Sequence, residues 1–85
     1  MASCEVRLKR SAEKELRALP RVDLTRVVDP IAALAAEPRP PGGEKLSGSE
    51  KYRIRQGDYR IVYSVDDRAL RVEVVKIGHR REVYR

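Results

Sequence analysis

Basic side chains gather in the second half of the sequence, where they could hold a phosphate backbone. They come from the stretch 51–65 and from the last seven residues, and with one aromatic residue the candidate site is Lys51, Arg53, Arg55, Arg60, His79, Arg80, Arg81 and Tyr84. Guanidinium groups match phosphate oxygens as a fork and stay charged at any working pH. A tyrosine ring can stack on an unpaired base. The set favours an RNA-phosphate site, and the alternative is a solvated sheet face rich in surface arginines.

Cleavage of RNA at such a set would use the neighbouring 2′-hydroxyl as the nucleophile. The reaction needs a proton acceptor, a cation on the charged transition state and a proton donor for the leaving oxygen. His79 is the one histidine, and its ordinary pKa of about 6.5 makes it the natural proton carrier. The alternative is an ordinary surface histidine. A serine triad fits poorly, because no Gly-x-Ser-x-Gly elbow is present.

The stretch KYRIRQGDYRIVYSV (51–65) must position these arginines. It alternates between apolar and polar residues on both sides of Gly57-Asp58, which is typical of two strands joined by a two-residue turn. In that register Arg55 faces Arg60, and directly opposed residues share a face of the sheet. Arg53, Arg55 and Arg60 then lie on one face, with no acid between them on these strands. The opposite face is predicted to be core and carries Tyr52, Ile54, Tyr59, Ile61 and Tyr63.

Two further strands are predicted, at Ser3–Lys9 and Ala69–Ile77, because both segments alternate between apolar and polar residues. If Val65 pairs with Leu70 across the turn after the hairpin, Tyr63 faces Val72 and Ile61 faces Val74. Residues 38–43 are rich in proline and glycine and are predicted to form a stiff loop.

Two helices are expected between the first strand and this loop. The first has Ser11 as its N-cap and stops at Pro20. The second carries the apolar stripe Leu24, Val27, Val28, Ile31, Leu34 and Ala35. Pro30 lies within it, so the segment is either one bent helix or two pieces with Asp29 as the second N-cap. The stripe keeps its phase across Pro30, which favours one bent helix.

These elements predict an α+β fold of order β-α-α-β-β-β. The two N-terminal helices pack on one face of a mainly antiparallel twisted sheet, and the arginine face stays open. The 85 residues suit a single domain, 1–85. The 19 Lys and Arg against 13 Asp and Glu give a formal charge of +6, which favours nucleic acid or an acidic protein as partner.

Composition also excludes several classes of protein. Cys4 is the single cysteine, so an internal disulfide is impossible, and with one histidine a structural zinc site is not expected. No phosphate-cradling glycine loop is present, and we expect no cofactor. No segment has the length and apolar character of a membrane span or a signal peptide. We therefore expect a cytoplasmic protein that does not bind membranes.

The segments KLSG (45–48), YRIRQGDYRIVYSVDD (52–67) and VEVVKIGHRREVYR (72–85) together resemble the RelE/ParE toxin superfamily, and most closely its RelE-like branch. The resemblance implies a type II toxin that is neutralised by its own antitoxin. It also implies a ribosome-dependent mRNA endoribonuclease, or mRNA interferase, that enters the ribosomal A site. DNA would be bound only through the antitoxin complex. The alternative is a ParE-like toxin that inhibits DNA gyrase without nuclease chemistry.

The resemblance also assigns roles to individual residues. Arg60 matches an arginine that stabilises the phosphate, Arg80 matches one thought to protonate the leaving group, and Tyr84 matches a tyrosine that stacks on the RNA. Arg53 and Arg55 stand where RelE has two lysines, one of them the proposed general base. A guanidinium, with a pKa above about 12, is a poor base. Either His79 takes the proton, or Arg55 acts only electrostatically and the reaction is slower.

The antitoxin is expected to use an acidic or amphipathic segment. This segment would cover Arg53, Arg55 and Arg60, or it would displace the basic tail.

Overall fold

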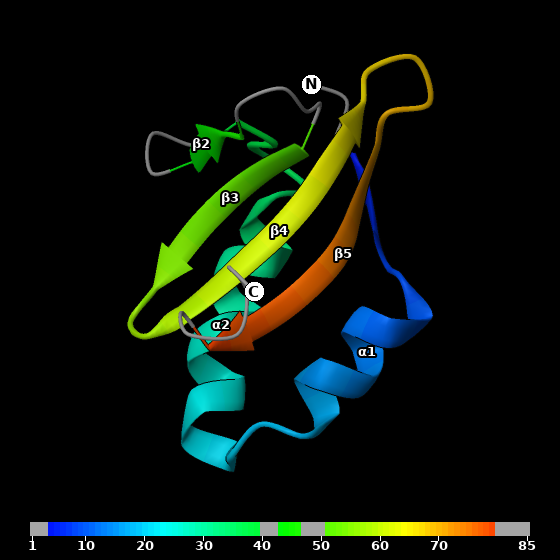
Figure 1. The fold of residues 1–85 in the computed structure, drawn as a ribbon. Coiled ribbons are helices and arrows are strands. Elements are labelled where there is room, and N and C mark those ends of the chain that lie inside the picture. The colour runs from blue at the N-terminus through cyan, green and yellow to red at the C-terminus, as the bar shows by residue number, and fades with distance from the viewer. Residues whose placement is uncertain (1–3, 40–42, 47–50, 80–85) are drawn as a thin grey trace.

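The computed structural model describes residues 4–39, 43–46 and 51–79. Its elements, in chain order, are β1 (Glu5–Leu8), α1 (Arg10–Arg17), α2 (Arg21–Ala33), β2 (Gly43–Lys45), β3 (Lys51–Gln56), β4 (Tyr59–Asp66) and β5 (Arg71–His79). The strands form one sheet in the order β1-β5-β4-β3-β2, in which β1 runs parallel to β5 and the other neighbours are antiparallel. Both helices pack on the same face of this sheet, so the predicted α+β architecture is confirmed (Figure 1).

The β3–β4 hairpin has the predicted register. Arg55 pairs with Arg60 and Tyr52 pairs with Tyr63. Gly57 has a φ of 60°, a conformation that glycine adopts without the steric cost borne by other residues. A two-residue turn permits only one register between the strands, so it fixes which side chains share a face.

The β4–β5 pairing differs from the prediction. Val65 pairs with Val72 and not with Leu70, Tyr63 pairs with Val74, and the register shifts between Val62 and Tyr63. One cause is a longer turn than expected. The carboxylate of Asp66 accepts hydrogen bonds from the backbone N–H groups of Arg68 and Ala69, each at 3.0 Å.

The register shift reverses the side-chain alternation along the last part of β5. Ile77 pairs with Ile61 and is buried, whereas uninterrupted alternation from Val74 would have pointed it to the open face. Beyond the end of β1, Glu15 of α1 reaches this edge of β5. Its carboxylate accepts a hydrogen bond from the backbone N–H of Ile77 at 3.1 Å and pairs with Lys76 at 3.2 Å.

The helices confirm part of the prediction. α2 is one helix that contains Pro30, as the unbroken apolar stripe predicted, and the alternative of two pieces with a break at Asp29 is excluded. α1 begins at Arg10 with Lys9 as its N-cap and without a side-chain cap, so the prediction for Ser11 was wrong. Val28 is exposed and lies outside the buried stripe. No helix in the described ranges is long and apolar enough to cross a membrane.

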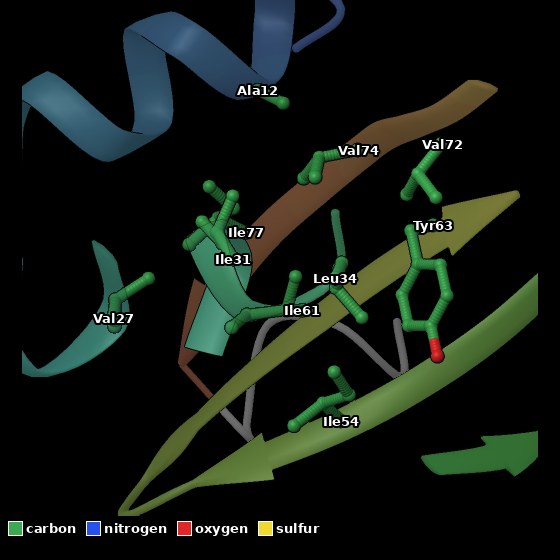
Figure 2. Close-up of a cluster of buried hydrophobic side chains, with 10 residues drawn as sticks. All are labelled: Ala12, Val27, Ile31, Leu34, Ile54, Ile61, Tyr63, Val72, Val74 and Ile77. Atoms are coloured by element: carbon green, nitrogen blue, oxygen red, sulfur yellow. The ribbon is translucent and has the colours of Figure 1, made fainter. Parts of the chain in front are cut away.

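The core lies between the helices and the sheet, as Figure 2 shows. Its members are Ala12, Val27, Ile31, Leu34, Ile54, Ile61, Tyr63, Val72, Val74 and Ile77. Tyr63 is fully buried, and its hydroxyl donates a hydrogen bond to the carbonyl of Pro38 at 3.0 Å. Cys4 packs against this cluster as a partly buried residue, as expected of a small core side chain.

The sequence prediction missed strand β2. The last residue of the expected loop and the two residues after it pair with β3 as a three-residue edge strand, with Glu44 opposite Arg53. The loop before it is fastened to the sheet by Arg39. This guanidinium donates to both carboxylate oxygens of Asp67 at 3.0 Å and to the hydroxyl of Tyr52 at 3.1 Å. Strand β2 thus places the carboxylate of Glu44 beside the arginine face.

Candidate nucleic-acid interface

The open face of the hairpin holds three arginines, as strand alternation predicts. Arg53 and Arg55 come from β3 and Arg60 comes from β4, with Arg55 directly opposite Arg60. Their strand neighbours Ile54 and Ile61 point into the core on the other side (Figure 2). Since directly opposed residues share a face, the three guanidinium groups project from the side that the helices leave uncovered.

Arg60 is the most enclosed of the three, with 9% of its surface exposed. Its Nη1 donates hydrogen bonds to the carbonyls of Tyr59 at 3.0 Å and Gly57 at 3.3 Å. Its Nε is buried and has no hydrogen-bond partner within residues 4–39, 43–46 and 51–79. A buried donor without a partner costs free energy, because it has lost water and gained nothing in return. A phosphate oxygen at this position would supply the missing acceptor.

Glu44 is the functional candidate that sequence reasoning missed. Its Oε2 lies 2.5 Å from Nη2 of Arg53, across the β2–β3 pairing. The hydrogen bond from Arg53 is the largest cause that lowers the pKa of Glu44 below 4.5, and the charges of Arg53, Arg55 and Arg60 lower it further. An acid therefore does stand among the arginines, although β3 and β4 carry none there.

His79 is not brought to the arginines. It pairs with Tyr59 and shares its face, and Tyr59 packs against the core on the helix side. The two rings meet edge-on with centroids 5.9 Å apart. The cause is the register shift in the β4–β5 pairing, which reverses the side-chain alternation before the end of β5. The hypothesis that His79 takes a proton beside Arg55 therefore has no support from its position.

A cavity of about 360 Å³ adjoins His79 on the helix side. It is lined by Asp23, Arg26, Gln56, Gly57, Asp58, Tyr59 and His79. The hydroxyl of Tyr59 donates a hydrogen bond to Oδ2 of Asp23 at 3.1 Å. This polar pocket and the arginine face lie on opposite sides of the same hairpin.

The other predicted site residues fall into two groups. Lys51 lies on β3 opposite Ser64, is exposed, and shares the open face with Arg53 by alternation. Arg80, Arg81 and Tyr84 lie outside the described residues, so their roles stay predictions. No group of three or more His, Cys, Asp or Glu residues in the described ranges could hold a metal ion. The described site is a cationic surface suited to binding an anion.

Comparison with known proteins agrees with this architecture. A family model described as the ParE toxin of type II toxin-antitoxin systems, parDE, matches residues 6–84. Toxin RelG of Mycobacterium tuberculosis is 32% identical over 84 residues, which cover 94% of each chain.

Two solved structures share the fold over nearly the whole chain. The archaeal RelE–RelB complex from Pyrococcus horikoshii OT3 matches with a TM-score of 0.83 and 29% identity, covering 94% of this chain and 98% of that one. The isolated E. coli RelE toxin matches with a TM-score of 0.82 and 28% identity, covering 96% and 92%. The protein therefore belongs to the RelE/ParE superfamily of type II toxins, and within it to the RelE-like branch.

Proposed function

We propose that this toxin is a ribosome-dependent endoribonuclease that cuts messenger RNA and so arrests translation. The observation that carries the proposal is Arg60, a buried guanidinium on the open face whose Nε has no hydrogen-bond partner among the described residues. Arg53 and Arg55 lie on the neighbouring strand of the same face. Surface arginines that only keep a protein soluble need not be buried with a donor unpaired.

The positions of the three arginines suggest different roles on the RNA phosphodiester. Arg60 would bind the scissile phosphate and neutralise the charge that grows on it as the 2′-hydroxyl attacks. Arg53 and Arg55 would hold the RNA backbone beside it. The proposed proton donor Arg80 and the stacking residue Tyr84 follow from the family resemblance.

The proposed partners are the ribosome with its message and a cognate antitoxin. Solved relatives include the RelBE2 toxin-antitoxin complex from M. tuberculosis and the intact RelBE toxin-antitoxin complex from E. coli. An antitoxin that presents an acidic segment to Arg53, Arg55 and Arg60 would block the same surface that RNA needs. Contact with DNA would come through that complex.

The test is cleavage of a message on purified ribosomes. Wild-type protein should cut within the open reading frame, as primer extension would show. Arg60→Ala should slow single-turnover cleavage by about 100-fold or more, because one preorganised charge on the transition state is lost. Arg17→Ala removes an arginine whose side chain is 78% exposed on α1, and it should cut like the wild type. An intact message with wild-type protein would contradict the proposal.

Inhibition of DNA gyrase is the second candidate, because the matching family model bears the ParE name. It predicts intact messages together with reduced supercoiling by purified gyrase, or accumulated gyrase–DNA cleavage complexes. Arg60→Ala separates the two functions, because gyrase inhibition has no need for a cation on a scissile RNA phosphate. The nuclease is selected if Arg60→Ala loses RNA cleavage while neither the wild type nor Arg60→Ala affects gyrase.

A further inference from the structure

Glu44 and Arg53 form an unequal pair on the open face. The side chain of Glu44 is 56% exposed, whereas that of Arg53 is 12% exposed. Glu44 comes from the short edge strand β2, and Arg53 lies within the sheet on β3. The carboxylate can therefore rotate into solvent at little cost, while the guanidinium is held in place by its surroundings.

The carboxylate also lies in the field of the whole arginine cluster. Arg53, Arg55 and Arg60 together lower the pKa of Glu44, so it is ionised at neutral pH. A carboxylate and a phosphate offer the same pair of acceptor oxygens to a guanidinium fork. An RNA phosphate that accepts the same Nη2 hydrogen of Arg53 must displace Glu44.

We propose that Glu44 is an internal substitute for phosphate, which holds Arg53 in the free protein and weakens binding of the RNA backbone until it is displaced. This inference rests on the proposed function, because it assigns a competitor to the same RNA-binding face. Glu44 thereby sets the affinity of that face, so that RNA is held firmly only where further contacts, such as those on a ribosome, add to the binding.

Glu5 is a matched control on the same side of the sheet. Its side chain is 50% exposed, and it pairs with Arg7 at 2.6 Å and with Arg71 at 3.6 Å. Strand β1 lies at the edge of the sheet opposite β2. Glu5→Gln removes the same charge from the protein as Glu44→Gln, but at a distance from the arginine cluster.

The experiment measures binding to a fluorescent single-stranded 2′-O-methyl RNA of about 12 nucleotides, a length within the range that small single-strand binding folds cover. This probe cannot be cut, because its 2′-oxygen is blocked. Glu44→Gln should tighten Kd by about three- to tenfold at moderate salt, since a like-charged competitor is removed from the site. Glu5→Gln should change Kd by less than about twofold, because exposed charges beyond a Debye length are largely screened.

The displacement itself is tested in a second background. With Arg53→Gln there is no guanidinium for Glu44 to occupy, so the added Glu44→Gln change should then improve Kd by less than about twofold. Melting curves of all variants confirm that each is folded. Unchanged or weaker binding by Glu44→Gln, an equal gain from Glu5→Gln, or an undiminished gain in the Arg53→Gln background would each overturn the inference.

These outcomes are distinct from failure of the proposed function. Binding that depends on Arg60 but ignores Glu44→Gln refutes only the role of Glu44. Wild-type protein that leaves messages intact on ribosomes refutes the nuclease, whatever the affinities. If neither wild type nor Glu44→Gln binds the RNA probe, the role of Glu44 is refuted, while the nuclease is still decided by cleavage on ribosomes.

Discussion

The two faces of the hairpin treat buried polar groups in opposite ways. On the helix-covered face the hydroxyl of Tyr63 is buried and donates to the carbonyl of Pro38. On the open face Arg60 is nearly as enclosed, yet its Nε has no hydrogen-bond partner in the part of the chain that the structure describes. Buried polar groups in native proteins are nearly all hydrogen-bonded, so an exception on one face calls for a reason. The covered face is completed by the chain itself, whereas the proposed function has the open face completed by an RNA phosphate.

Adjacent residues on β4 allow this difference to be measured. Ile61 points into the core and Arg60 points to the open face, one residue apart on the same strand. If the covered face holds the fold together and the open face serves binding, substitutions at these two positions should separate stability from activity.

The largest effect on stability is expected from Ile61→Ala. Ile61 is fully buried between the two layers, so its truncation removes apolar contacts and leaves a cavity. The free energy of unfolding should fall by about 2–4 kcal/mol. Urea titration followed by circular dichroism measures it. Val22→Ala, at an exposed position on α2, should change it by less than about 0.5 kcal/mol. A loss below about 1 kcal/mol at Ile61 would mean that the covered face is not the stabilising one.

A smaller loss is expected from Tyr63→Phe. The change keeps the ring and removes the hydroxyl, so the carbonyl of Pro38 loses the hydrogen bond that the hydroxyl donates at 3.0 Å. Burial also raises the pKa of Tyr63, so the group removed is a neutral donor. The free energy of unfolding should fall by about 1–2 kcal/mol, measured by the same titration. RNA binding should be unchanged, and a Tyr63→Phe protein as stable as wild type would show that this hydroxyl is dispensable.

Arg60→Met should cost no stability, in contrast to both changes on the covered face. It replaces an incompletely bonded buried cation with an apolar chain of similar length. Replacing buried ionic groups with apolar chains of similar volume is often neutral or stabilising, and we expect a change between zero and a gain of about 1 kcal/mol. The same protein should lose RNA cleavage, as Arg60→Ala does. A loss of more than about 2 kcal/mol would instead give Arg60 a structural role.

The sequence predicted the fold best where a short turn permits only one strand register. The two-residue Gly57-Asp58 turn fixes the β3–β4 register, and with it the shared face of Arg55 and Arg60. Strict alternation in residues 51–65 then assigns the remaining side chains. The helix through Pro30 was also predicted, because its apolar stripe keeps one phase.

The sequence-based predictions were wrong where the alternation of apolar and polar residues does not specify the strand register. The register shift between Val62 and Tyr63 is invisible in a strand rich in valine, yet it moves His79 to the helix side. The turn after β4 is lengthened by bonds to the carboxylate of Asp66, which residue type alone does not reveal. Glu44 lies in a three-residue edge strand, too short to show any period. Of the described open face, the shared position of Arg53, Arg55 and Arg60 was therefore predicted, and the carboxylate of Glu44 was missed.

The smallest effect on stability is expected where the open face pairs its own charges. The folded protein lowers the pKa of Glu44 below 4.5, chiefly through the hydrogen bond from Arg53. A lowered pKa means that this pair contributes stability above the unfolded-state pKa, and that the contribution is lost as pH falls through the folded-state pKa. Urea titrations should therefore show Glu44→Gln slightly less stable than wild type at neutral pH, with the difference vanishing in acid below the folded-state pKa. Salt should reduce the difference at neutral pH, because the carboxylate is exposed. A stability difference that grows as the pH falls would mean that Glu44 stabilises the fold by an interaction other than its charge. Displacement of the Glu44 side chain by RNA would then disturb strand β2.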